Sequence, residues 1–310
     1  MRGHSVPETG LPVALPAVWS SIEPNSQVTA PKMPVSATNT TSSLTSPTRV
    51  GSRQLARLRR SLSERDWQVL RLVAGHRYLS SGLVEAFCFD DHATPASGAR
   101  TARRVLRRLA ESGLLVTLGR RVGGVRAGSS SYVWQLAPAG ARLLMSGDSP
   151  RRPHEPSPRF LDHCLSVANV HLQLLGLQRQ GRLEQVSVQL EPDCWRGFVG
   201  PGGERRLLQP DLYVRTVTAR YEDRWFIEVD LGTESLPTLL GKCAQYEIYR
   251  ASGSEQAASG VFPLVVWHLS TAARRDALAT RIARSAALTP QLYRLALPGE
   301  LPGLVVGSPP

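Results

Sequence analysis

Three acidic side chains with the spacing of a cation site lie in the second half of the chain. Asp211 follows Pro210 at the start of one expected strand, and Glu228 and Asp230 lie near the end of another, residues 225–231. Alternate side chains of a strand point to opposite faces, so Glu228 and Asp230 share a face. Unpaired carboxylates in an apolar setting are costly and need a cation or a hydrogen-bond donor. Oxygen ligands on neighbouring strands suit Mg²⁺ or, as an alternative, Mn²⁺.

A helix expected over residues 235–250 brings a second group of polar side chains. Lys242, Gln245, Tyr246 and Tyr249 have the spacing i, i+3, i+4, i+7, which places them on one helical face. If this face meets the carboxylates, Lys242 can stabilise developing negative charge, and Gln245 and Tyr249 can position a substrate or the waters of an ion. The spacing therefore predicts that this helical face points polar groups at the carboxylates.

Three short motifs carry a family resemblance: Pro210-Asp211, Glu228-Val229-Asp230 and Gln245-x-x-x-Tyr249. As a set they resemble the PD-(D/E)xK nuclease superfamily, and the third resembles its RecB-like branch. The resemblance implies a restriction-endonuclease-like domain with a small mixed sheet and a Mg-dependent endodeoxyribonuclease activity. It implies Asp211 and Glu228 as metal ligands, together with a main-chain carbonyl near Val229. Asp230, which shares a face with Glu228, is a further candidate ligand.

The chain departs from that family at the catalytic lysine. Asp230 occupies the position where the family has this lysine. Lys32 and Lys242 are the only lysines of the chain, so a catalytic lysine in the folded region has to be Lys242, displaced onto the helix. The alternative is an inactive site, in which arginines pair with the carboxylates and the tyrosines are ordinary core residues.

Three further polar residues flank this group. Glu191 ends the preceding expected strand and is assigned to the surface, with an auxiliary acid of the same site as the alternative. His163 and His171 lie eight residues apart on one expected helix. We interpret both as satisfied histidines near the core rather than as metal ligands.

Composition favours a polyanionic partner. The 310 residues carry a formal net charge of +12 and a pI near 10.4, which suits double-stranded DNA. No apolar run reaches transmembrane length, so no membrane partner is expected. The four cysteines are scattered without a C-x-x-C pair, which indicates buried thiols in a reducing cytoplasm.

The order of predicted elements gives two domains of an α+β or α/β protein. Residues 1–60 are predicted to be a disordered tail with a basic end, and residues 61–146 a winged helix-turn-helix domain. A Pro-rich linker at 147–157 leads to the nuclease-like domain at 158–300. Residues 301–310 are predicted to be a loose tail.

Eight arginines of the first domain are predicted DNA contacts. The third helix, expected at 98–112, and the following basic loop, or wing, supply them: Arg100, Arg103, Arg104, Arg107, Arg108, Arg120, Arg121 and Arg126. The helix is expected to enter the major groove, and the wing to hold phosphates. The alternatives are a solvated helix face and a winged helix that contacts protein.

The two-domain pattern as a whole also resembles the replication-relaxation family of actinobacterial plasmids and mobile elements. The resemblance rests on the predicted winged helix, the Phe160-Leu161-Asp162-His163 segment and the acidic motif of the second domain. It implies a role in replication, relaxation or transfer of such an element, with plasmid replication or transfer proteins as partners and a homodimer as a possible assembly. The alternatives are an inactive nuclease-like accessory that binds DNA and a winged-helix transcriptional regulator.

Overall fold

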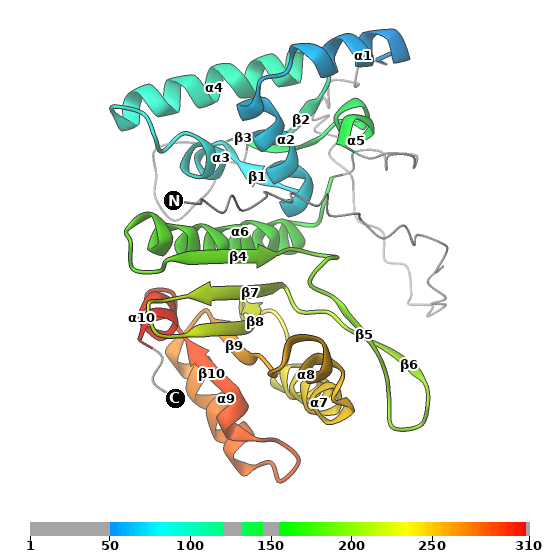
Figure 1. Ribbon diagram of the computed structural model, residues 1–310, viewed down its shortest axis with the longest axis vertical. Helices are drawn as coiled ribbons and strands as arrows, with labels where there is room; N and C mark the ends of the chain where they lie inside the picture. Colours follow the sequence, from blue (N-terminus) through cyan, green and yellow to red (C-terminus); the bar gives the residue numbers. More distant parts are fainter. Residues whose placement is uncertain (1–49, 121–131, 145–154, 308–310) are drawn as a thin grey trace, which may run out of the picture. The chain divides into compact units, whose positions relative to one another are not determined.

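The structure is a computed structural model that describes residues 50–120, 132–144 and 155–307, without the side chains of residues 119 and 120 (Figure 1). All described residues belong to one compact unit. Helices and a five-stranded mixed sheet confirm the α+β class. None of the helices in these ranges has the length and apolar character needed to span a bilayer.

The first part of the chain, which we call the amino-terminal module, contains α1 to α5 and β1 to β3. Its elements are α1 (Ser52–Ser61), α2 (Glu64–His76), β1 (Leu79–Ser80), α3 (Ser81–Cys88), α4 (Pro95–Glu111), β2 (Leu115–Arg120), β3 (Tyr132–Leu136) and α5 (Pro138–Leu144). The strands form an antiparallel sheet in the order β1-β3-β2. The predicted start of α2 is confirmed, since Ser63 and Asp66 form a capping box.

The predicted amino-terminal tail is wrong at its end, because residues 52–61 form α1. Leu55 and Leu58, three residues apart on one face of this helix, pack against the core of the module. Arg142 of α5 donates to the Val50 carbonyl oxygen at 2.9 Å. The arginines around these leucines, Arg53, Arg57, Arg59 and Arg60, hid the apolar spacing. The rest of the predicted tail, residues 1–49, lies outside the described residues.

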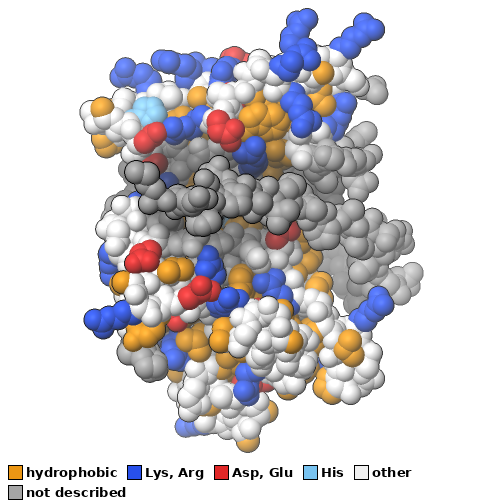
Figure 2. All heavy atoms as spheres, viewed as in Figure 1, with side chains coloured by type: hydrophobic (Ala, Val, Ile, Leu, Met, Phe, Trp, Pro, Cys, Tyr) orange, Lys and Arg blue, Asp and Glu red, His pale blue; other side chains and the backbone are white. Residues whose placement is uncertain are grey.

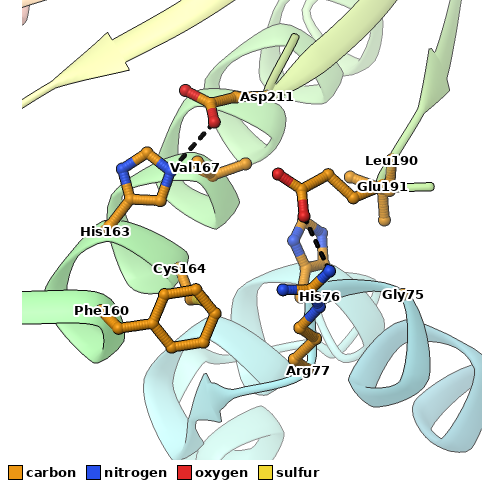
Figure 3. Close-up of a pocket in the computed structure, with 10 residues that line it drawn as sticks. All are labelled: Gly75, His76, Arg77, Phe160, His163, Cys164, Val167, Leu190, Glu191 and Asp211. Carbon is orange, nitrogen blue, oxygen red and sulfur yellow. Dashed lines mark hydrogen bonds and ion pairs between the residues drawn. The ribbon is translucent and has the colours of Figure 1, made fainter. Parts of the chain in front are cut away.

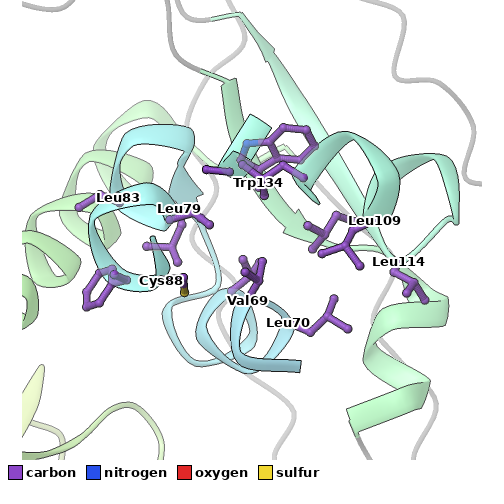
Figure 4. Packing of buried hydrophobic residues seen from close by; sticks show 14 of the residues in the cluster. Val69, Leu70, Leu79, Leu83, Cys88, Leu109, Leu114 and Trp134 are labelled. Atoms are coloured by element: carbon purple, nitrogen blue, oxygen red, sulfur yellow. The ribbon is translucent and has the colours of Figure 1, made fainter. Parts of the chain in front are cut away.

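One hydrophobic cluster joins the amino-terminal module to the next helix. Figure 4 shows side chains of this cluster, among them Val69, Leu109 and Trp134. Ala168 of α6 (Pro158–Arg179) is fully buried in the same cluster, and further leucines of α6 pack against it. The module and α6 therefore share a core. Most of the predicted linker, residues 147–154, lies outside the described residues, and the two-domain division stays a prediction.

The remaining elements build the larger sheet. They are β4 (Gln185–Gln189), β5 (Arg196–Val199), β6 (Arg205–Leu208), β7 (Leu212–Val217), β8 (Glu222–Asp230), α7 (Leu236–Ser252), α8 (Ser254–Ser259), β9 (Leu264–Leu269), α9 (Ala272–Arg284), β10 (Tyr293–Ala296) and α10 (Leu301–Val306). The strand order is β10-β9-β8-β7-β4, with β8, β9 and β10 parallel and β7 and β4 antiparallel. The β5–β6 hairpin, which the sequence did not predict, extends from this sheet (Figure 1).

The two faces of β8 meet different helices, as the alternation predicts. Trp225 and Ile227 pack in a cluster with α6 and α10, whereas Phe226 packs in a cluster with α7 and α9. Glu228 therefore faces α7. The predicted loose tail at 301–310 is wrong over residues 301–306, because Leu301 and Val305 of α10 are buried against this sheet.

Candidate functional site

Glu228 occupies the centre of the site, on the face of β8 that meets α7. The residue is 2% exposed. The Tyr246 hydroxyl donates to Glu228 Oε1 at 2.6 Å, and Lys242 Nζ lies 3.4 Å from Glu228 Oε2. Lys242 and Tyr246 are four residues apart and so lie on one face of α7. That helix is positioned by its cap, in which the Ser235 hydroxyl accepts from the Thr238 amide.

Asp211 lies just before β7, next to Glu228. The pairing of Leu212 with Ile227 brings the start of β7 to the end of β8. Asp211 Oδ2 accepts from the Val229 amide at 2.7 Å, and Asp211 Oδ1 lies 3.0 Å from His163 Nε2 of α6. One carboxylate thus connects two strands and a helix.

A cavity of about 460 Å³ opens beside these two carboxylates. Six of the residues that line it were singled out from the sequence: Glu191, Asp211, Glu228, Lys242, Gln245 and Tyr246. Arg77 of the amino-terminal module and Glu191 complete its charged wall. The cavity therefore combines three carboxylates with two basic side chains.

The charges in this cavity perturb one another. Burial, and after it the charge of Asp211, raises the pKa of Glu228 to about 8. Burial, rather than repulsion between the carboxylates, is the larger cause. Burial alone would lower the pKa of Lys242, but the charges of Glu228, Asp211 and Glu234 outweigh it and raise that pKa. Lys242 is therefore a cation at neutral pH and not a base.

Asp230 lies away from this group. Arg274 of α9 forms a bidentate ion pair with it, and the Gly232 amide donates to its Oδ1 at 3.2 Å. Asp230 does not line the cavity. The carboxylate is one pleat further along β8 than Glu228, which brings it under α9 rather than α7. The predicted convergence of three carboxylates is thus found for Asp211 and Glu228 but not for Asp230.

Tyr249 also lies outside the cavity. Its hydroxyl donates to Glu255 Oε2 at 2.6 Å, and its ring packs against Phe198 and Phe262. Tyr246, one turn earlier on α7, is the tyrosine that contacts a site carboxylate. Gln245 lines the cavity, as its position on the helical face suggested.

A smaller cavity of about 40 Å³ adjoins the first on the side of α6 (Figure 3). Asp211, Glu191 and Arg77 line both cavities. His163 points at Asp211 here, and that hydrogen bond raises the pKa of His163. His163 therefore belongs to the site, although we interpreted it from the sequence as a structural histidine near the core.

His171 has the structural role that the sequence assigned to it. Its Nδ1 lies 3.0 Å from His76 Nε2, between α6 and α2. Burial lowers the pKa of His171 to about 4 and that of His76 to about 3, so both rings are neutral at physiological pH. The pair fixes the amino-terminal module against α6.

The donor set around the cavity fits a divalent cation in part. Asp211 and Glu228 offer carboxylate oxygens on adjacent strands, and His163 offers a ring nitrogen next to Asp211. Over the described ranges, no three His, Cys, Asp or Glu side chains are grouped closely enough to hold an ion as they stand. Binding would require Glu228 Oε2 to exchange its contact with Lys242 for the ion, while Tyr246 keeps Oε1.

A second charged surface lies on the amino-terminal module. Figure 2 shows Lys and Arg side chains gathered at the top of the view, over α4 and α1. The exposed arginines of α4 are Arg100, Arg103, Arg104, Arg107 and Arg108. Arg108 pairs with buried Asp66, whereas the other four have no acidic partner among the described residues. The Arg120 side chain and residues Arg121 and Arg126 lie outside the described residues.

The model of the replication-relaxation family matches residues 70–265. The chain belongs to this family. The match spans α2 to β9 and so includes α4 and the cavity of this replication-relaxation protein. Membership indicates a role in replication or relaxation of a plasmid or other mobile element. No curated protein and no solved structure matches the chain.

Proposed function

We propose that this replication-relaxation protein binds duplex DNA through α4 and cleaves DNA at the cavity beside Glu228 with Mg²⁺ or Mn²⁺. One observation carries the proposal: the ammonium group of Lys242 lies 3.4 Å from Glu228, although the usual lysine position after this glutamate is occupied by Asp230. A cation beside the carboxylates that would hold the ion can stabilise the negative charge that develops in phosphodiester hydrolysis.

Each residue of the cavity has a distinct part in this proposal. Asp211 and Glu228 would hold the ion, which when bound supplies charge stabilisation and an activated water. His163 orients Asp211 through its hydrogen bond. Lys242 stabilises negative charge on the phosphate, because its raised pKa keeps it protonated. Tyr246 holds Glu228 at 2.6 Å and so sets the direction of that carboxylate.

The α4 surface provides the DNA-binding part of the proposal. Four exposed arginines without acidic partners in the described ranges offer an uncompensated positive stripe along one helix. Phosphate contacts of this kind supply most of non-specific DNA affinity and make it dependent on salt. The helices before α4 and the antiparallel strands β2 and β3 after it support the proposal that α4 is the recognition helix of a winged helix.

A second candidate function is a DNA-binding accessory or regulator without cleavage. The observation that favours it is that both Glu228 oxygens already have protein partners, Tyr246 and Lys242. In this alternative the cavity is a remnant of a nuclease site and α4 alone carries the function.

Ion-induced stabilisation separates these two functions. An ion that binds only the folded protein at ten times its dissociation constant adds about 1.4 kcal/mol, or roughly 2–4 °C in Tm for a chain of this size. We expect Mn²⁺ to raise the Tm of the full chain by this amount, and Asp211→Asn or Glu228→Gln to abolish the rise. Lys242→Ala should keep it, because Lys242 is not a ligand. As a control, Asp276→Asn removes an exposed carboxylate from α9 and should leave the rise unchanged. A wild-type Tm that does not respond to Mn²⁺ would favour the accessory function.

A further inference from the structure

Arg77 is held in a strained turn at the end of α2. Its φ of 65° and ψ of −46° and the 2.7 Å hydrogen bond from the Tyr78 amide to the His76 carbonyl define a γ-turn with positive φ, which is rare for residues other than glycine. Among the described residues, Arg77 is the only non-glycine with positive φ. Glycine would adopt this turn without strain. Strain of this kind is tolerated where a side chain has a role in function.

The Arg77 side chain extends from the amino-terminal module to the wall shared by the two cavities (Figure 3). Its Nη2 lies 2.7 Å from Glu191 Oε2, and its guanidinium carbon is 5.7 Å from the centre of the Phe160 ring. These contacts fix the direction of the guanidinium, which is still 42% exposed. Its Nε and Nη1 donors have no partner among the described residues.

These free donors point to an anion. A guanidinium carries five N–H donors in a planar fork that matches two oxygens of a phosphate. Asp211 and Glu228 line the same cavity, and a cation between them would attract the phosphate of a nucleic-acid strand to the same place. Lys242 offers a second positive charge on the α7 side of that cavity.

We propose that Arg77 is a DNA-phosphate ligand that the amino-terminal module contributes to the cavity. The inference rests on the proposed function, since it assumes that a DNA strand enters this cavity. It adds that the site is incomplete without the module: α4 holds the duplex, and Arg77 of the same module holds a backbone phosphate beside the carboxylates. Glu191 keeps the guanidinium in place before DNA binds.

Arg77→Gly separates the function of this side chain from its backbone strain. Glycine accepts the turn, so the Tm of the variant should equal or exceed that of the wild type. Affinity of the full chain for a short fluorescein-labelled duplex should fall about tenfold, and the slope of log affinity against log salt should decrease by about one, as loss of one phosphate contact requires. Arg77→Lys, which keeps the charge without the fork, should lose less affinity and keep the slope.

Arg71→Ala is the matched control, because Arg71 lies on the exposed face of the same helix and pairs with Glu64. Arg71→Ala should change the affinity for the duplex and the salt slope much less than Arg77→Gly does. Wild-type affinity and slope in Arg77→Gly would overturn the inference while leaving the proposed function intact, provided that substitutions on α4 weaken binding. If Arg77→Gly does not fold, Arg77→Asn replaces it, because asparagine adopts positive φ more readily than most residues and carries no charge. Wild-type affinity and slope in Arg77→Asn would then overturn the inference. Loss of binding by Arg77→Gly with an unchanged Mn²⁺-induced rise in Tm would support it.

Discussion

The Glu228→Gln variant should gain stability relative to the wild type as pH rises from 4.5 to about 8. Below pH 4.5 the Glu228 carboxyl is protonated in both the folded and the unfolded chain, so the substitution changes little. Between pH 4.5 and about 8 the unfolded chain releases this proton while the folded chain keeps it, and the wild type loses stability over that window. Glutamine does not titrate, so the variant lacks this loss.

The size of the effect follows from the position of Glu228. One pKa unit corresponds to about 1.4 kcal/mol, so the displacement from 4.5 to about 8 sets an upper limit of about 5 kcal/mol at pH 8 and above. Relaxation of the protein around a buried charge makes the actual penalty smaller than this limit. We therefore expect the variant to gain at least about 2 kcal/mol over the wild type between pH 4.5 and 8.

Urea unfolding of both full-length proteins at several pH values, without divalent ions, measures this difference. Glu234→Gln is the matched control, because it removes a charge 3.2 Å from the same lysine at a side chain that is 41% exposed. It should show no gain that grows with pH. A difference between Glu228→Gln and wild type that stays constant from pH 4.5 to 8 would refute the reasoning, since it would mean that Glu228 is ionised throughout the folded state.

Two further outcomes test the α4 surface and the shared core. A triple alanine variant on α4, at Arg103, Arg104 and Arg107, should lower DNA affinity at least tenfold and reduce the salt slope by about three. A control triple alanine variant elsewhere, at Arg220, Arg281 and Arg284, should have a much smaller effect. Equal affinities of these two triple variants would contradict the assignment of α4 to DNA. Limited trypsin digestion should remove residues before about 50 and cut within 147–157, and the two fragments should elute together because α6 shares the core of the module. Fragments that separate under native conditions would show that this shared core does not hold the halves together.

The sequence predicts the centre of the site because short-range rules govern it. Alternation along residues 225–231 places Glu228 on one face, and the neighbouring strand brings Asp211 next to it. Helical spacing then turns Lys242 and Tyr246 of α7 toward the same carboxylate. These relations depend on strand and helix periods, which a sequence displays directly.

The parts that the sequence did not predict depend on contacts between distant segments. Asp230 meets Arg274, which is 44 residues away on another helix. Tyr249 turns to Glu255 because the chain reverses at Gly253, where φ is 72°. Arg77 enters the cavity from a different module altogether. No local pattern identifies the partners of Asp230 and Arg77, since both require the packing of the sheet and its helices. The Tyr249–Glu255 contact spans only six residues but depends on how the chain turns between α7 and α8.

Nicking of supercoiled plasmid by the full-length protein tests the central claim that the cavity beside Glu228 cleaves DNA. We predict nicking in Mg²⁺ or Mn²⁺ that is lost on removal of the ion and in Asp211→Asn and Lys242→Ala. The Lys32→Ala variant, which lacks the only other lysine of the chain, should nick the plasmid at the wild-type rate. Absence of ion-dependent nicking by the wild type, or nicking that persists in Asp211→Asn, would contradict the account.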